Sequence, residues 1–113
     1  MGLFSRRKEK KERAAIDALF ARLDGRELQY VVRRLIKEDG SPAEEVLGKG
    51  GRIMAPGNFV AVYAGQKQVF LNNDPATVVC GELMALNGVR IQGHNELTDR
   101  DDVLIAYYSY YRK

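Results

Sequence analysis

The stretch that decides the fold runs from residue 48 to residue 94 and reads GKGGRIMAPGNFVAVYAGQKQVFLNNDPATVVCGELMALNGVRIQGH. It consists of short segments rich in β-branched and aromatic residues, separated by Gly, Pro and Asn. Such punctuation is typical of antiparallel strands that follow one another along the chain. We therefore predict an antiparallel β-meander over residues 48–113.

Two short turns in this stretch are expected to set the strand pairing. Gly65-Gln66 separates residues 59–64 from residues 67–71 and suits a type II′ turn. Asn87-Gly88 is the strongest two-residue hairpin signal. It predicts three partners across the turn, namely Leu86 with Val89, Met84 with Ile91 and Glu82 with Gly93. One apolar face would then hold Val78, Cys80, Met84, Leu86, Val89 and Ile91, with Glu82 set into it.

The last strand, expected over residues 103–111, carries four of the six tyrosines. Because alternate residues of a strand share a face, Tyr107 and Tyr111 should face one way and Tyr108 and Tyr110 the other. The preceding residues are apolar on both faces, which is typical of a strand covered on both sides. We predict wall residues whose hydroxyls reach water or a partner. The candidate interaction residues are Tyr108, Tyr110 and Arg112.

Residues 9–23 are expected to form an amphipathic helix. Apolar residues recur there at three- and four-residue steps, so that one stripe holds Ala15, Ile16, Leu19, Phe20 and Leu23. Asp24-Gly25 ends the pattern, because glycine readily adopts the left-handed conformation of a helix end.

Residues 27–38 fit two kinds of secondary structure. A helical stripe would hold Leu28, Val31, Val32, Leu35 and Ile36. Asp24 with Glu27 three residues later also resembles a capping box. As a strand, the segment would have its apolar face interrupted by Arg34. We favour the helix, so that residues 9–40 are mainly helical, and leave the strand open as the alternative.

Chain length and composition predict a single domain over residues 9–113. With 113 residues, 45% of them hydrophobic, the chain can bury one core but not two. The fold class is α+β. We expect an N-terminal amphipathic helix, and a second helix if residues 27–38 are helical, packed on an antiparallel sheet of six or seven strands or on a partly open barrel.

The positive charge is concentrated at the N-terminal end. Residues 1–13 hold six Lys or Arg and two Glu, a net charge of +4, whereas the other 100 residues have a net charge of −1. We predict that residues 1–8 form a basic flexible tail. Such a segment can make weak contact with an anionic membrane surface or a nucleic acid. The candidate contact residues are Leu3, Phe4, Arg6, Arg7, Lys8, Lys10 and Lys11.

The residue types needed for catalysis do not occur together. His94 and Cys80 are the sole residues of their kinds, so no Cys-His pair or His/Cys metal site is expected from the sequence. GKGG at residues 48–51 lacks the spacing of a phosphate-binding loop and is followed by a strand pattern. We therefore predict a protein that is not an enzyme, with no cofactor and no small-molecule substrate.

Cysteine usage and hydropathy indicate the compartment. One cysteine cannot form an internal disulfide, which suits a reducing cytoplasm. The apolar runs are far shorter than the roughly 20 residues that a membrane-spanning helix needs. The N-terminal residues also lack the apolar core of an export signal. The expected location is the cytoplasm.

Four segments carry a resemblance to known proteins: GKGGRI, VAVYAGQKQVF, GELMALNGVRIQG and VLIAYYSYYRK. This series resembles a family of small uncharacterised bacterial proteins, and the meander of residues 48–113 is similar to pleckstrin-homology-like β-barrels. In that fold the closing helix follows the last strand, whereas the helical pattern here comes first. The resemblance implies a binding scaffold, without family active-site residues.

We expect a non-catalytic interaction module that binds a protein partner or a second copy of the chain. Binding of an anionic surface through the basic tail is the alternative.

Overall fold

The computed structural model describes the backbone of residues 3–108 and the side chains of residues 13–108. Within this range the chain is α+β, with one α-helix, α1 (Leu3–Leu23), followed by strands and one short 3-10 helix, η1 (Pro75–Thr77). The strands are β1 (Leu28–Ile36), β2 (Pro42–Lys49), β3 (Gly51–Met54), β4 (Val60–Ala64), β5 (Lys67–Asn72), β6 (Val79–Glu82), β7 (Gly88–Asn95) and β8 (Arg100–Tyr108).

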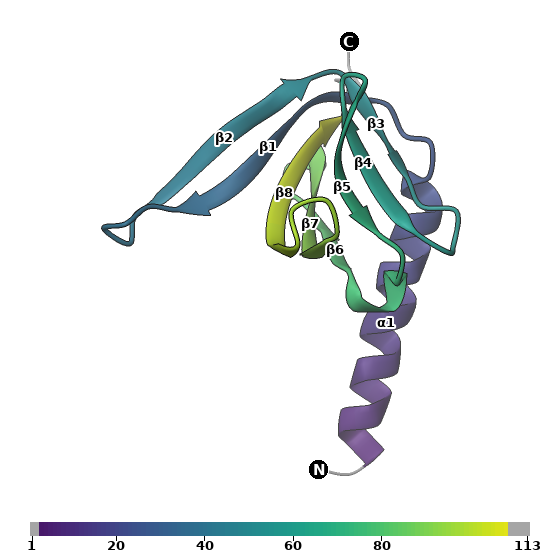
Figure 1. Ribbon diagram of the computed structural model, residues 1–113. Helices are drawn as coiled ribbons and strands as arrows, with labels where there is room; N and C mark the ends of the chain where they lie inside the picture. Colours follow the sequence, from purple (N-terminus) through teal and green to yellow (C-terminus); the bar gives the residue numbers. More distant parts are fainter. Residues whose placement is uncertain (1–2, 109–113) are drawn as a thin grey trace.

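The strands form two antiparallel sheets rather than the single sheet of six or seven strands that we expected. One sheet has the strand order β2-β1-β8-β7-β6, and the other has the order β3-β4-β5 (Figure 1). Backbone contacts join the sheets at two corners. Glu27 bridges to Arg52 at one corner, and the Glu96 amide donates to the Leu71 carbonyl at the other, at 2.8 Å. Over residues 3–108 these corners do not close the sheets into a barrel.

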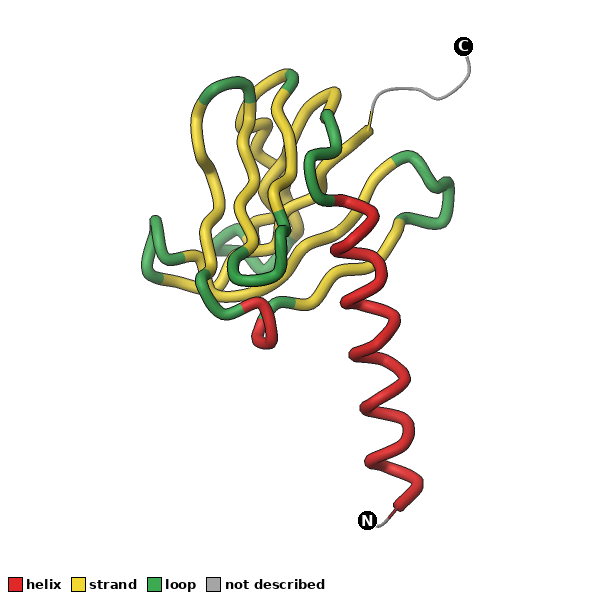
Figure 2. The backbone as a smooth tube through the Cα atoms, turned by 90° about the vertical axis from the view of Figure 1, so that its right-hand side faces the viewer, coloured by secondary structure: helices red, strands yellow, loops and turns green. Residues whose placement is uncertain are grey.

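Helix α1 packs its C-terminal half on the core and extends beyond the sheets at its N-terminal end (Figure 2). Leu19, Phe20 and Leu23 are buried in the core, as their helical spacing predicts. The helix ends at Leu23, and Gly25 has a φ of 80°, in agreement with the predicted stop. The backbone of residues 3–8, expected as a tail, belongs to the helix.

The core lies between the inner faces of the two sheets and α1. Its largest fully buried apolar side chains come from both sheets and include Phe70, Ile53, Ile91, Leu104, Val31 and Val62. Each such side chain contributes roughly 1.5–3 kcal/mol to folding through its removal from water. Packing therefore fixes the relative position of the two sheets.

The helix favoured for residues 27–38 is wrong, because this segment forms strand β1. Val31 and Val32 point to opposite faces of the sheet, and both are buried. A strand in which adjacent residues are both buried lacks the alternation of apolar and polar residues. In this sequence the spacing of the apolar residues therefore also fits a helical stripe. The segment forms a strand because its backbone pairs with both β2 and β8.

The register predicted from Asn87-Gly88 is also wrong. Strand β6 ends at Glu82, and Cys80 pairs with Ile91 where we expected Met84. The intervening loop leaves Met84 fully exposed. Gly88 is instead required by the neighbouring strand β8, because a Cβ atom there would lie 2.6 Å from the Ala106 carbonyl oxygen.

The first predicted hairpin is confirmed. Strands β4 and β5 pair with Ala64 opposite Lys67, so that Gly65-Gln66 is the two-residue turn. Gly65 has a φ of 63°, and Gln66 is not among the described residues with positive φ. A positive φ at the first turn residue alone agrees with type II′.

Candidate interaction surfaces

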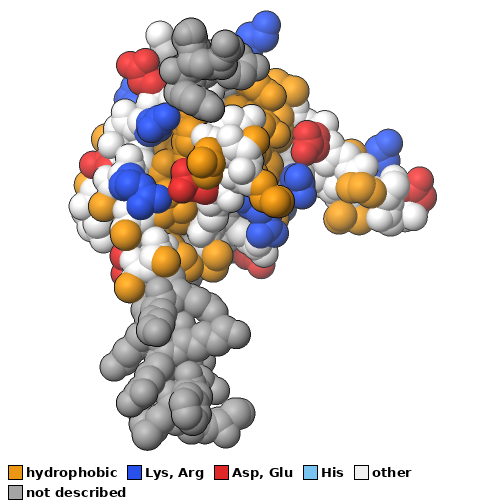
Figure 3. All heavy atoms as spheres, turned by 180° about the vertical axis from the view of Figure 1, so that it is seen from behind, with side chains coloured by type: hydrophobic (Ala, Val, Ile, Leu, Met, Phe, Trp, Pro, Cys, Tyr) orange, Lys and Arg blue, Asp and Glu red, His pale blue; other side chains and the backbone are white. Residues whose placement is uncertain are grey.

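The hairpin of β1 and β2 projects from the body and exposes apolar side chains. We call its outer part, residues 33–46, the arm (Figure 1). The side chain of Ile36 is 75% exposed and that of Val46 is 63% exposed. In the space-filling view, hydrophobic atoms appear on the projecting arm and on the adjoining body (Figure 3). Strand β2 is an edge strand of its sheet, with β1 as its neighbour among the described strands.

Local interactions hold the arm together. Arg33 lies 3.3 Å from Glu45, and Arg34 lies 3.4 Å from Glu44, in two successive cross-strand pairs. At the tip, the Asp39 carboxylate accepts hydrogen bonds from the Ser41 hydroxyl and amide, which lower the pKa of Asp39. Exposed pairs of this kind contribute little, and a two-stranded hairpin is marginally stable by itself.

A buried polar network connects the base of the arm to the body. The Arg33 Nε atom lies 3.6 Å from a carboxylate oxygen of Asp102, which is buried in β8. Asp102 also accepts hydrogen bonds from the side chains of Asn95 and Thr98. Because these groups come from β1, β7, β8 and the turn before β8, the direction of the arm is coupled to the core.

Two stacked tyrosines lie on the outer face of the large sheet. The rings of Tyr30 and Tyr107 are 4.5 Å apart with an interplanar angle of 21°. Partial burial, and then the neighbouring Tyr30, raise the pKa of Tyr107. Because Tyr30 shares its face of β1 with Ile36, whose side chain lies on the arm, the stack and the apolar arm residues lie on one surface of the sheet.

The structure describes one of the three predicted interaction residues, Tyr108. Tyr108 is buried in the core, with the Arg26 guanidinium carbon 4.2 Å from its ring centroid, so it is not available as an exposed contact. Burial is the main cause that raises its pKa. Tyr110 and Arg112 lie outside the described residues. Sequence reasoning missed Tyr30 and Ile36 because it assigned β1 to a helix. It missed Val46 because β2 (Pro42–Lys49) begins before residues 48–113, where the strands were expected.

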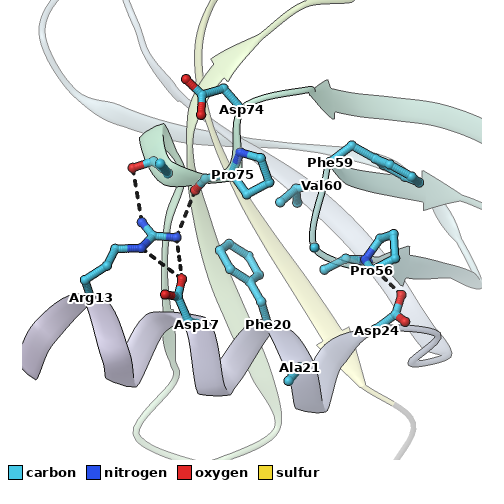
Figure 4. Close-up of a pocket in the computed structure, with 13 residues that line it drawn as sticks. Arg13, Asp17, Phe20, Ala21, Asp24, Pro56, Phe59, Val60, Asp74 and Pro75 are labelled. Atoms are coloured by element: carbon cyan, nitrogen blue, oxygen red, sulfur yellow. Dashed lines mark hydrogen bonds and ion pairs between the residues drawn. The ribbon is translucent and has the colours of Figure 1, made fainter.

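An open pocket of about 700 Å³ lies beside α1, and we call it the α1 pocket. The loop after β3 and the segment from Asp74 to Ala76 form its other walls. Figure 4 shows the Phe20 ring rising from the helix toward Val60, with Pro75 and Pro56 on either side. Phe59 completes an apolar lining.

Arg13 joins α1 to the η1 segment at one end of this pocket. Its guanidinium donates hydrogen bonds to the backbone carbonyls of Pro75, Ala76 and Val78, at 2.9 to 3.2 Å. It also pairs with Asp17 at 2.8 Å (Figure 4). The positive charge of Arg13 is therefore already satisfied within the fold.

Two further carboxylates, Asp24 and Asp74, line the α1 pocket. One oxygen of Asp24 accepts the Ala55 amide at 2.8 Å. Within the part of the chain whose side chains are described, neither carboxylate has a cation within ion-pair distance. The pocket therefore combines an apolar lining with a negative rim.

The side chains most often used in catalysis are dispersed. Burial raises the pKa of Cys80 to about 11, so its thiol is not a ready nucleophile. His94 lies between Asp99 and Asp101, at 3.2 and 3.6 Å. Glu82, expected on an apolar face, is exposed and pairs with Arg22. Among the described residues, no group of three or more His, Cys, Asp or Glu could hold a metal ion.

The predicted anionic-surface residues all belong to the N-terminal half of α1. The backbone from Leu3 to Lys11 is helical, whereas the side chains of Leu3, Phe4, Arg6, Arg7, Lys8, Lys10 and Lys11 lie outside the described residues. The structure therefore places this basic segment at one end of the molecule, as part of a helix that is anchored at its other end (Figure 2).

Comparison of the chain with protein-family models, with curated proteins and with solved structures found no match. The expected pleckstrin-homology-like relationship therefore stays a prediction. The described helices include none that is long and apolar enough to cross a membrane.

Proposed function

We propose that this protein is a non-catalytic interaction module whose arm binds a protein partner in the bacterial cytoplasm. The observation that carries the proposal is the exposure of Ile36 and Val46 on a hairpin that projects from the body. Cys80 is buried as a free thiol, which suits a reducing compartment.

Energetics favour a partner on the arm. Burying an aliphatic side chain that is exposed in the free protein stabilises a complex by roughly 1.5–3 kcal/mol. The neighbouring Tyr30 and Tyr107 are of a type that is enriched at interfaces. Because the outer part of a two-stranded hairpin lacks packing of its own, a partner would also stabilise the arm.

The test is capture of binding partners with a purified tagged chain. We expect a partner that remains bound at high salt and is lost with the double substitution Ile36→Ser and Val46→Ser. Met84→Ser is the matched control, because it removes an exposed apolar side chain far from the arm in sequence. A partner retained equally by the double variant would contradict the role of the arm. Absence of any captured partner would contradict the proposed function as an interaction module.

A second function, binding of an anionic surface, is supported by the position of the basic segment. The segment continues α1 beyond the sheets, where it can approach a flat surface without hindrance from the body (Figure 2). Each Lys or Arg near an anionic membrane contributes roughly 1 kcal/mol. Leu3 and Phe4 would add shallow insertion.

Sedimentation with vesicles tests this second function. We expect binding to anionic vesicles at low salt, with little binding to neutral vesicles. Raising the salt concentration, or changing Leu3 and Phe4 to Ser, should weaken the binding. Equal binding to both kinds of vesicle, or no binding to anionic vesicles at low salt, would contradict a membrane as the anionic surface. A shift of single-stranded DNA in the same low-salt buffer would then identify nucleic acid as the anionic surface.

A further inference from the structure

We propose that the α1 pocket binds the N-terminal segment, residues 1–8, of a second copy of this chain. The resulting dimer would pair two α1 helices antiparallel. This inference concerns a surface separate from the arm, so it does not depend on the proposed protein partner.

The pocket has two properties that an occupant must match. Its lining is apolar, with the rings of Phe20 and Phe59 and two prolines, Pro56 and Pro75. Its rim carries Asp24 and Asp74, which no cation of the described side chains neutralises. An occupant with apolar side chains next to cations satisfies both properties.

Residues 1–8, MGLFSRRK, have this chemistry. Leu3 and Phe4 are adjacent apolar residues, and three cations follow at Arg6, Arg7 and Lys8. The segment holds no acidic residue and has a net charge of +3, whereas residues 9–113 hold 15 Lys or Arg and 15 Asp or Glu and have no net charge. Charge complementarity therefore selects this segment of the chain as the partner for the acidic rim.

The segment cannot enter the pocket of its own chain. Its residues 3–8 belong to the same continuous helix as Arg13, Asp17 and Phe20, which line that pocket. At 1.5 Å per residue, Leu3 stands about 15 Å away from Arg13 along the helix axis. The occupant must therefore come from another copy.

An antiparallel pair of helices lets both copies make the contact at once. Residues 3–8 of each helix then run alongside the C-terminal half of the other, at the level of the pocket. The same patch is used on both copies, so the contact closes as a two-fold dimer and does not propagate into a filament. Opposed helix dipoles also favour the antiparallel arrangement.

Analytical ultracentrifugation over a range of protein concentrations tests the dimer. At low salt we expect a monomer–dimer equilibrium that shifts toward monomer as salt rises, because the ion pairs are exposed. The substitutions Asp24→Asn and Asp74→Asn together should raise the dissociation constant about tenfold. Asparagine keeps an oxygen that can accept the Ala55 amide at position 24, so folding should be retained.

The control is Glu38→Gln with Asp39→Asn, which makes the same change of charge at the tip of the arm. This variant should dimerise like the parent chain. Reversal of the segment charges by Arg6→Glu and Arg7→Glu should abolish the dimer, and adding Asp24→Lys with Asp74→Lys should restore it. The melting midpoint of each variant separates loss of binding from loss of folding.

Two outcomes would overturn the proposal. One is a protein that stays monomeric at every concentration at low salt. The other is a dimer whose dissociation constant is unchanged by the pocket substitutions. A dimer that instead responds to Ile36→Ser and Val46→Ser would show that copies associate through the arm, which also overturns the pocket contact while supporting the arm.

Discussion

The side-chain amide of Asn95 donates a 2.8 Å hydrogen bond to the carboxylate of Asp102, and both residues are buried. The same amide donates to the Val69 carbonyl, at 2.9 Å. The Asn95 oxygen accepts the backbone amides of Leu71 and Leu97. One side chain therefore connects β5, β8 and the turn between β7 and β8, and it fills all its hydrogen-bonding capacity.

Asn95→Ala should destabilise the protein by about 2–4 kcal/mol, because it leaves buried donors and acceptors without partners. Urea unfolding measures the loss. The matched control is Asn73→Ala, which removes one exposed side-chain hydrogen bond to Glu96, keeps the one donated by the Asn73 backbone amide and should cost about 0.5 kcal/mol. Equal losses in the two variants would show that the network around Asn95 is not important for stability.

Met84→Asp should leave the protein folded. Met84 lies in the loop between β6 and β7 and is fully exposed, so a charge there remains in water. Ile91→Asp places the same charge in the core and should cost several kcal/mol, enough to unfold the domain. Circular dichroism with thermal melting distinguishes the two. An unfolded Met84→Asp protein would instead support the register first expected from Asn87-Gly88.

Arg13→Ala should destabilise the protein by about 2 kcal/mol, because three backbone carbonyls lose a charged donor. Arg13→Lys should recover part of the loss, since lysine keeps the charge but lacks the planar fork. Arg22→Ala serves as the control, because its exposed pair with Glu82 contributes less than about 1 kcal/mol. Chemical denaturation of the three variants tests this order.

Cys80 should make stability depend on alkaline pH. Burial raises its pKa from the ordinary value of 9.0 to about 11, so the folded state favours the neutral thiol. The resulting stabilisation is complete below pH 9.0 and is lost as pH rises through about 11. Between pH 9.0 and about pH 11, Cys80→Ala should lose less stability than the parent chain, although its free energy of unfolding is lower at neutral pH. An identical decline in both proteins would refute the assignment to this thiol.

Thiol chemistry provides an independent check on Cys80. In the folded protein the thiolate population is small at moderately alkaline pH, and alkylation should be slow. Unfolding in urea should make alkylation fast at the same pH. Rapid alkylation without denaturant would show that the thiol is more accessible than its burial indicates.

Local sequence signals were sufficient to predict the elements in which one short-range interaction dominates. The stripe of Leu19, Phe20 and Leu23 predicted the anchored part of α1, because side chains three and four residues apart share a helix face. Gly65-Gln66 predicted the β4–β5 hairpin, because a positive φ at the first turn residue is easily adopted by glycine. The α+β class follows from the change between these two patterns.

The candidate surfaces were not predictable from such signals. Ile36 is exposed because β1 and β2 extend past the other strands, and the length of that extension depends on pairing across the sheet. Val46 lies opposite Val32 and is exposed on β2, the edge strand of the sheet among the described strands. The α1 pocket is formed by segments as distant in sequence as Asp17 and Asp74. No local sequence pattern therefore predicts the acidic rim of this pocket.

The sequence by itself determined residues 9–23 of the helix, the first hairpin and the concentration of positive charge in residues 1–13, because each depends on neighbours along the chain. Tertiary structure decided that residues 28–36 form a strand, since this segment pairs with both β2 and β8 and buries Val31 and Val32 on opposite faces. It also decided the register of β6. Gly88 is needed where β7 passes close to Ala106, and this long-range contact overrides the turn preference of Asn87-Gly88.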